Sequence, residues 1–195
     1  KNHFPSDLAS SETADLFMSV IMYRLKDNGR AAVILPDGFL FGTDNAKVSI
    51  KKKLFSEFNL HTIIRMPGSV FAPYTSITTN ILFFDKAHPT KETWFYRLDM
   101  PDGYKHFSKT KPMKLEHCQP IKEWWHDRKE IVSQDGNEKS RCFSVQDLIS
   151  LDCNFDQCKF PKDEEEILPP AELLANYFKK RAALDYEIDK TLAEI

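Results

Sequence analysis

The sequence lacks the features that mark secreted and membrane-spanning proteins. No apolar run approaches the roughly 20 residues needed to cross a bilayer. Residues 1–5 have neither the charged region nor the apolar core of a signal peptide, and the first residue is Lys, not Met. We therefore expect a cytoplasmic protein and an excised or truncated segment of a longer chain.

The cysteines are few and widely spaced. None forms a C-x-x-C pair, at positions Cys118, Cys142, Cys153 and Cys158. Without a secretory signal, reduced thiols are the simplest interpretation. Four residues separate Cys153 from Cys158, and His117 and His126 lie near Cys118, but a zinc site needs four ligands in tighter pairs. The sequence predicts buried or incidental thiols and no metal site.

Motifs for nucleotide binding and for nucleophilic catalysis are also missing. The six glycines form no G-x-G-x-x-G and no P-loop. The sequence has no G-x-S-x-G and no H-E-x-x-H. We therefore predict no catalytic residue and no cofactor-binding residue in this segment.

The charge is unevenly distributed along the chain, although the net charge is only −2. Residues 41–114 contain twelve Lys and Arg against six Asp and Glu, whereas residues 115–195 contain eleven against eighteen. A basic middle can face phosphate groups, and an acidic tail is poorly suited to that. The charge alone is equally consistent with a solvated surface that carries its charges unevenly and binds no phosphate.

Hydrophobic content of 42% and fifteen Phe indicate a globular core. Apolar spacing of three to four residues predicts helices over 13–26 and 45–57. Asn28-Gly29 should end the first, with Gly29 as a left-handed cap, and Lys51, Lys52 and Lys53 should lie on a solvated face of the second. Short apolar runs predict strands, at 31–35, 60–65, 79–84 and 94–98.

The order of these elements indicates an α/β fold with an antiparallel end. The run 31–35 does not alternate, which is typical of a parallel strand covered on both faces. Only about 13 residues join the strands 60–65 and 79–84, too few for a crossover helix with its turns, so these two should be antiparallel.

The second half is predicted to be less regular. Residues 101–120 are polar and loop-like, residues 121–141 should be weakly ordered, and the acidic run 163–166 should be a solvated linker. Residues 144–151 form a short helix with Ser144 as N-cap and Asp147 three residues on. After Pro169-Pro170 a final helix carries a heptad seam with two polar interruptions, which suits docking to a partner or folding back onto its own domain.

One candidate site residue follows from position. Asp37, after Pro36, lies at the carboxyl end of a predicted strand, where α/β sheets place their sites. The alternative is that Pro36-Asp37-Gly38 only forms a turn, because all three residue types favour turns.

Two blocks then carry a resemblance to a known family: GRAAVILPDGFLFG (29–42) and MPGSVFAPYTSITTNILFFDK (66–86). Both are very similar to the stretch that follows the catalytic motif in M subunits of type I restriction-modification systems, which belong to the N-6 adenine DNA methylases. The flanks ADLFMSVIMYRLK (14–26), KETWFYRLDMPDGYKHFSKTKPMK (91–114) and PPAELLANYFKKRAALDYEIDKTLAEI (169–195) are similar too. The resemblance covers most of the chain and implies the C-terminal half of such a subunit.

The resemblance implies a partial class I (Rossmann-like) S-adenosylmethionine-dependent methyltransferase sheet with an antiparallel last strand, plus a C-terminal helix. The strands at 31–35, 60–65 and 79–84 would be its fifth, sixth and seventh. We expect residues 1–100 to be part of the catalytic domain, 101–168 a loop-rich extension, and 169–195 a docking or coiled-coil helix.

The implied activity is methylation of adenine at its exocyclic N6 amine, with S-adenosylmethionine as methyl donor and a base flipped out of the duplex. The family's cofactor loop and Asn-Pro-Pro-aromatic motif do not occur here, because the only Pro-Pro pair, Pro169-Pro170, follows Leu168 far downstream. We expect this segment alone to be inactive and not to bind the cofactor.

The resemblance also suggests which side chains face DNA. The family's base-stacking aromatic falls on SVFAPYT, with Phe71 as first choice and Tyr74 as second; Pro36 and Asp37 would form the active-site rim. The alternative places Phe71 in the core and lets Tyr74 only shape the loop. Phosphate contacts would come from four lysines that could equally be ordinary surface residues: Lys105, Lys109, Lys111 and Lys114.

The implied partners are DNA, a specificity (S) subunit and a restriction (R) subunit, with the C-terminal helix as the docking element and the target sequence read by another subunit. The competing hypothesis is a non-catalytic interaction or oligomerisation module from a truncated gene. A half-sheet would leave its fifth strand with an unpaired edge, so copies of this segment alone should associate.

Overall fold

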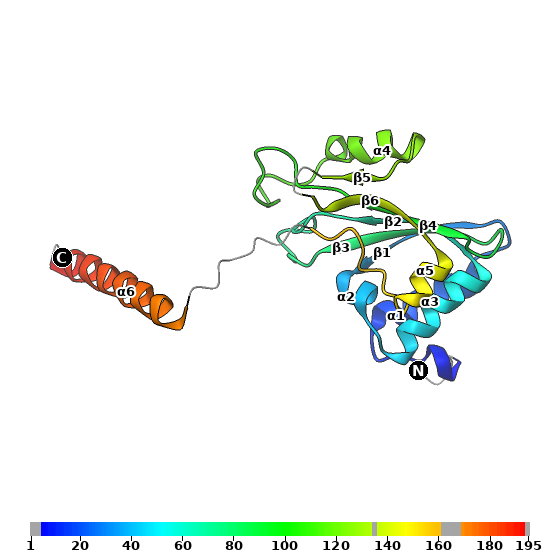
Figure 1. Cartoon of the computed structure of the whole chain (residues 1–195), viewed down its shortest axis with the longest axis horizontal. Helices are drawn as coiled ribbons and strands as arrows, with labels where there is room; N and C mark the ends of the chain where they lie inside the picture. The colour runs from blue at the N-terminus through cyan, green and yellow to red at the C-terminus, as the bar shows by residue number, and fades with distance from the viewer. Residues whose placement is uncertain (1–4, 134–135, 161–168, 194–195) are drawn as a thin grey trace. The chain divides into compact units, whose positions relative to one another are not determined.

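A computed structural model describes residues 5–133, 136–160 and 169–193. The chain divides into two compact units, residues 1–161 and 162–195. The first unit contains a six-stranded sheet with helices on both faces, and the second contains one helix (Figure 1). The strands are β1 (Arg30–Pro36), β2 (Asn59–Arg65), β3 (Thr79–Asp85), β4 (Glu92–Arg97), β5 (Ile131–Val132) and β6 (Glu138–Ser144). The helices are η1 (Ser6–Leu8), α1 (Thr13–Arg24), α2 (Asp37–Phe41), α3 (Asn45–Glu57), η2 (Leu115–Cys118), α4 (Gln119–His126), α5 (Val145–Ser150) and α6 (Pro170–Ala193).

The strand order is β1-β3-β2-β4-β6-β5. Strand β3 lies between β1 and β2 and is antiparallel to both, whereas β2 and β4 are parallel. Strand β6 then pairs antiparallel with β4, and β5 with β6. The expected α/β class, the antiparallel arrangement of 60–65 and 79–84 and the C-terminal helix are confirmed.

Each face of the sheet is covered by its own apolar cluster. On one face α1, α3 and α5 pack through residues such as Met18, Leu54 and Leu148, each with no more than 2% of its surface exposed. On the other face Tyr96 and Leu98 pack against Trp124 of α4. Figure 1 shows α4 on the side of the sheet opposite to α1, α2, α3 and α5. The sheet is therefore the central layer of the first unit.

Strand β1 differs from its prediction as a buried parallel strand. It is antiparallel to its neighbour β3 and lies at the edge of the sheet, with 52% of Ile34 exposed. Among the described residues no strand pairs with its other side, which agrees with the expected unpaired edge. A short apolar run does not distinguish a central strand from an edge strand.

Two local predictions were also wrong. Asn28, not Gly29, has the left-handed backbone, with φ of 59°, and α1 ends at Arg24, two residues before the predicted end at residue 26. Lys51 is not solvated, because its side chain is fully buried beneath α2. Asn is the residue after Gly that adopts the left-handed region most readily, so either position could have been chosen.

Residues 121–141 are more regular than their mixed charges indicated. Most of α4 and the first residues of β6 fall in this range, and β6 continues the main sheet beside β4. The helix predicted at 144–151 is confirmed as α5, with the capping box of Ser144 and Asp147 in place. The acidic run 163–166 lies outside the described residues.

Helix α6 is a unit of its own. None of its described residues is buried, and apolar side chains recur along it, at Leu174, Tyr177, Leu184 and Ile188. Within the described part of the chain, no helix has the length and apolarity to cross a membrane.

Candidate functional site

The site is built at the end of the sheet where β1 and β2 finish and β3 begins. Asp37 follows β1 directly as the first residue of α2, so it does not sit in an isolated turn. Its backbone N–H donates to the carbonyl of Thr78 at 3.2 Å, and its Oδ1 accepts from Nδ2 of Asn80 at 2.6 Å. Asp37, a predicted rim residue, is therefore held in place by contacts with Thr78 and Asn80, which precede and belong to β3.

Arg65, the last residue of β2, adds charge to this network. Its Nη1 lies 3.6 Å from Oδ2 of Asp37, and its Nη2 forms an ion pair with Oδ1 of Asp156. Burial tends to raise the pKa of Asp156, but hydrogen bonds and attraction from Lys159 and Arg65 outweigh burial and lower it. Asp156 is therefore held as a carboxylate against a guanidinium that is 7% exposed.

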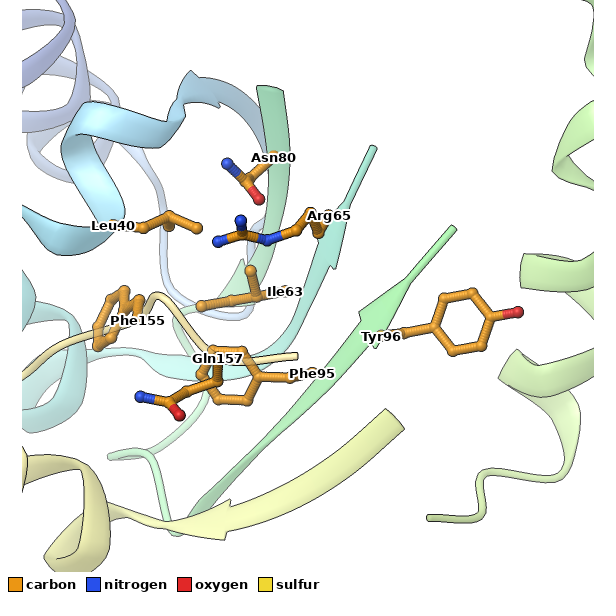
Figure 2. Close-up of a pocket in the computed structure, with 8 residues that line it drawn as sticks. All are labelled: Leu40, Ile63, Arg65, Asn80, Phe95, Tyr96, Phe155 and Gln157. Atoms are coloured by element: carbon orange, nitrogen blue, oxygen red, sulfur yellow. The ribbon is translucent and has the colours of Figure 1, made fainter. Parts of the chain in front are cut away.

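Figure 2 shows Arg65, Asn80, Leu40 and Phe155 gathered on one side of the sheet, with Tyr96 pointing away from them. These side chains, with Ile63, Phe95 and Gln157, pack so closely that the space between them does not admit a water molecule. The network around Asp37 is consequently closely packed and is not a ligand cavity.

The loop between β2 and β3, residues 66–78, carries both predicted stacking residues and is called the aromatic loop here. Phe71 is 40% exposed and Tyr74 is 92% exposed, so the alternative in which Phe71 is a core residue does not hold. The Phe71 carbonyl accepts from the N–H of Tyr74 at 2.9 Å, which closes a tight turn that contains a cis Ala72–Pro73 bond. Part of the Phe71 side chain is therefore accessible from outside the loop.

Residues 101–114, called the lysine loop here, carry the four candidate phosphate contacts. All four lysines are exposed. The loop is held by Phe107, which is 2% exposed and stacks on the ring of His117 with 5.6 Å between centroids. Lys111 lies over the Tyr104 ring and Lys114 pairs with Glu116 at 3.4 Å. The anchored aromatic leaves the lysine side chains facing solvent.

One hydrogen bond joins the two loops. The backbone N–H of Phe107 donates to Oγ of Ser69 at 2.8 Å, and Ser69 is two residues before Phe71. Ser69 has a positive φ of 60°, a conformation that is rare for residues other than Gly, Asn and Asp. The structure thus brings the predicted stacking residues and the predicted phosphate-contact lysines to neighbouring loops.

The described part of the chain offers no cluster of potential metal ligands. Nowhere in ranges 5–133, 136–160 and 169–193 do three His, Cys, Asp or Glu side chains come together as ligands would. All four cysteines are free thiols, and burial raises the pKa of Cys158 to about 12. This thiol therefore stays protonated at neutral pH.

A family model described as N-6 DNA Methylase matches residues 2–166, which is most of the chain. The chain belongs to the N-6 DNA methylase family.

Individual relatives of this family member are methylase subunits of type I restriction enzymes. The chain is 47% identical to the EcoEI methylase subunit of Escherichia coli over 186 residues, 94% of this chain and 38% of that protein. It is 38% identical over 120 residues to the EcoKI methylase subunit of E. coli K12. The chain spans about two fifths of the EcoEI subunit's length and a smaller share of the EcoKI subunit's.

Solved structures agree with these sequence relatives. A modification subunit of a putative type I restriction enzyme from Vibrio vulnificus YJ016 is 42% identical with a TM-score of 0.67, over 75% of this chain and 30% of that one. A second match comes from a structural study of complex assembly and conformational transition in the type I restriction-modification system. It is 31% identical with a TM-score of 0.70, over 96% of this chain and 40% of that one. The chain therefore has the fold of the matching part of type I modification subunits.

Several residues of the candidate site in this family member carry little or no sequence signal of their own. Arg65, Asn80 and Asp156 form the support beneath Asp37, and Ser69 and Phe107 join the loops. A charged residue ending an apolar strand, as in LHTIIR, was the one available signal for Arg65. Asp156 is 91 residues away from Arg65 in sequence, and nothing in its own segment indicates the contact.

Proposed function

We propose that the chain is part of a type I restriction-modification DNA methyltransferase subunit that transfers a methyl group from S-adenosylmethionine to the N6 amine of adenine. The observation that supports this most is the exposed ring of Phe71 on a loop bonded to the lysine loop. One loop offers a stacking surface and the other offers positive charge, which is the combination that a flipped base and its flanking phosphates require.

In this proposal Phe71 stacks on the extruded adenine, with Tyr74 as the second candidate, and Pro36 and Asp37 form the rim of the pocket. A π-face serves any base, and such stacking contributes roughly 1–3 kcal/mol per base. Phe71 is favoured over Tyr74 because its 40% exposure leaves the ring partly packed and oriented, whereas Tyr74 is 92% exposed. An ordered ring loses less conformational entropy when it binds.

Lys105, Lys109, Lys111 and Lys114 are proposed to contact DNA phosphates. This proposal is supported by the exposure of all four lysines and by the hydrogen bond of Phe107, which holds their loop beside the aromatic loop. Such contacts position a protein on DNA without reading sequence, so the target sequence is assigned to another subunit.

S-adenosylmethionine would supply the methyl group in the complete subunit. The glycines of this chain form no loop suited to its binding, and no residue here is assigned to it. The chain's own contribution is the base-side wall and the DNA-facing loops. We expect the 195 residues alone neither to bind the cofactor at micromolar affinity nor to methylate adenine; calorimetry and a methyl-transfer assay test both.

The proposed partners besides DNA are a specificity subunit and a restriction subunit, in the cytoplasm. Helix α6 is the proposed docking element, because its apolar side chains are exposed and a seam of this kind is buried by a second helix.

The test of the stacking role uses the full-length subunit assembled with its specificity partner. Phe71→Ala should lower the rate of adenine methylation by roughly fivefold to 150-fold, the loss of about 1–3 kcal/mol of stacking. Phe71→Trp is the matched control, because it keeps a π-face and should retain most activity. Unchanged turnover in Phe71→Ala would exclude the stacking role.

A second readout separates stacking from folding. When 2-aminopurine replaces the target adenine, its fluorescence should be quenched by a stacked ring in the wild type and increase in Phe71→Ala. Equal melting temperatures of the two proteins would show that the fold is intact.

A further inference from the structure

Residues 153–160, which follow α5 and are called the strap here, cross the ends of two parallel strands. The last register pair of β2 and β4 is Arg65 and Arg97, two arginines that are 6% and 1% exposed. Both bind the strap. Arg65 pairs with the side chain of Asp156, and Nη1 of Arg97 donates to the carbonyl of Lys159. Two adjacent buried guanidinium groups therefore hold the strap at two points.

Arg97 fixes its end of the strap independently of the site. Its Nε donates to Oδ1 of Asp99 at 2.7 Å and its Nη2 donates to Oγ of Ser133 at 2.8 Å. The guanidinium also lies over the ring of Phe160, 5.7 Å from the centroid. These contacts do not involve α2, so the strap has an anchor outside the rim.

The strap also contacts α2 from beneath. The backbone N–H of Phe155 donates to the carbonyl of Leu40 at 3.0 Å, and the Phe155 ring is fully buried. Nζ of Lys51 donates to the same carbonyl at 2.7 Å and lies 5.1 Å from the Phe155 centroid. The strap thus meets the carboxyl end of α2 directly.

Both ends of α2 depend on these contacts. The helix has five residues, and a helix this short does not hold its conformation without tertiary contacts. At its first residue, Asp37 is held by Asn80 and by Arg65, whose other partner is Asp156. At its last turn, Leu40 is held by Phe155 and Lys51.

We infer that the strap positions Asp37 for the reaction, through the ion pair of Asp156 with Arg65. Arg65 and Asp156 are positioning residues, since neither is placed against the substrate. Asp156 draws one side of the Arg65 guanidinium and so orients its other side toward Asp37. Arg65 also precedes Met66, whose N–H donates to the Thr79 carbonyl at 2.9 Å and closes the aromatic loop. The role in catalysis rests on the proposed function, whereas the mechanical coupling does not.

The first experiment measures hydrogen exchange in Asp156→Asn, a change of equal size that removes the charge. In the full-length subunit assembled with its partner, the amides of Asp37 and Gly42 should exchange about tenfold faster than in the wild type, as expected for a locally weakened unit. Asp152→Asn is the control, because Asp152 is exposed next to the strap and Asn tolerates its positive φ. Unchanged exchange at Asp37 and Gly42 would overturn the inference and leave the proposed function standing.

A second measurement needs no variant. If the strap and α2 form one unit, the amides of Phe155, Asp37 and Gly42 exchange through the same opening event in the wild type. The opening free energies from hydrogen exchange should then fall with urea concentration at the same rate for all three. Gly42 donates to the Gly38 carbonyl inside α2, so it reports on the helix itself. Different urea dependences for Phe155 and Gly42 would overturn the inference even where Asp156→Asn fails to fold.

The third experiment tests the catalytic consequence. In the assembled methyltransferase, Asp156→Asn should lower kcat about tenfold with little change in the KM for DNA, because a displaced rim affects the geometry of reaction more than binding. In an enzyme that already carries Asp37→Asn, adding Asp156→Asn should not lower kcat further. A purely structural defect caused by Asp156→Asn would instead add its own loss of kcat to that of Asp37→Asn. Additive losses would overturn the positioning role. A wild type without adenine methylation would refute the proposed function, and the exchange experiments would still decide the coupling.

Discussion

At the scale of single residues, Lys51 is unusual because its ammonium is buried among backbone carbonyls and aromatic rings. It donates to the carbonyls of Leu40 and Gly42 and lies near the rings of Phe39 and Phe155. None of the carboxylates in the described ranges forms an ion pair with it. Burial lowers the pKa of Lys51 from its ordinary 10.5 to about 8. The folded chain therefore releases this proton more readily than the unfolded chain does.

This pKa predicts a dependence of stability on pH that Lys51→Met removes. Between about pH 8 and 10.5 the unfolded chain binds more protons at Lys51, so the free energy of unfolding rises with pH across that window. Relative to Lys51→Met, the wild type should gain at most about 3 kcal/mol, at about 1.4 kcal/mol for each pKa unit. Urea unfolding at several pH values measures the difference. Lys52→Met, on the exposed side of α3, still contains Lys51 and should keep the pH dependence of the wild type. A Lys51→Met variant that also keeps it would contradict the assignment.

The lysine loop predicts an effect on the salt dependence of DNA binding. If Lys105 and Lys109 each neutralise a phosphate, the double Ala variant of the assembled enzyme should reduce the slope of log affinity against log salt by about 2. The loss should be similar for cognate and unrelated DNA, because phosphate contacts carry no sequence information. Fluorescence anisotropy from low to moderate salt measures both. Lys52→Ala is the control, and a slope equal to that of the wild type in the double variant would rule out these contacts.

At the scale of elements, α5 depends on its N-terminal cap. Oγ of Ser144 accepts from the Asp147 N–H at 3.1 Å, and Oδ2 of Asp147 accepts from the Ser144 N–H at 3.2 Å. The helix has six residues, buries Leu148 completely and leads into the strap. A short helix of this kind gains a large share of its stability from such reciprocal bonds.

Ser144→Ala should therefore lower the free energy of unfolding by about 1 kcal/mol, the usual cost of removing a Ser cap. Urea denaturation measures the loss, which should lower the midpoint and leave the dependence of the unfolding free energy on urea concentration unchanged. Ser150→Ala removes an exposed hydroxyl at the other end of α5 and should cost only a few tenths of a kcal/mol. Equal losses in the two variants would show that the cap contributes nothing specific.

Local signals explain which elements could be predicted. Helix α3 was predicted over its observed range, because its apolar residues follow the helical period and Asp44 caps it by accepting from the Lys47 N–H at 3.1 Å. Strands β2 and β3 were predicted within one residue at each end. Strand β6 was missed because it pairs with β4, about 48 residues away, and its own sequence EKSRCFS lacks a clear alternation.

The candidate site could be predicted only in part, for the same reason. Phe71 and the lysines are predictions from the resemblance, and Asp37 is a prediction from its place after a strand. Their proximity depends on the contact of Ser69 with Phe107 and on that of Arg65 with Asp156. Each of these contacts joins segments far apart in sequence, and no short-range pattern records such pairing.

At the scale of the whole molecule, the two edges of the sheet differ. The β5 edge is two residues long and lies at the end of the order β1-β3-β2-β4-β6-β5. The β1 edge is seven residues long, and nearby α1 exposes Phe17 and Tyr23 at 62% and 83%. A long, apolar edge is a template for pairing with another chain, so the β1 side is where the first unit is open to association.

The last prediction follows from that edge: copies of the 195-residue chain alone should associate through β1. Ile34→Lys places a charge on the exposed face of the edge strand, a change that opposes strand pairing between copies. Sedimentation at increasing concentration should show a larger mass for the wild type and a monomer for Ile34→Lys. Ile149→Lys is the control, because Ile149 is 50% exposed on α5 and lies away from the edge. If association persists in Ile34→Lys but disappears in Leu184→Lys, the contact between copies is made by α6 and not by β1. Leu184→Lys removes apolar contacts only from a coiled coil formed by α6.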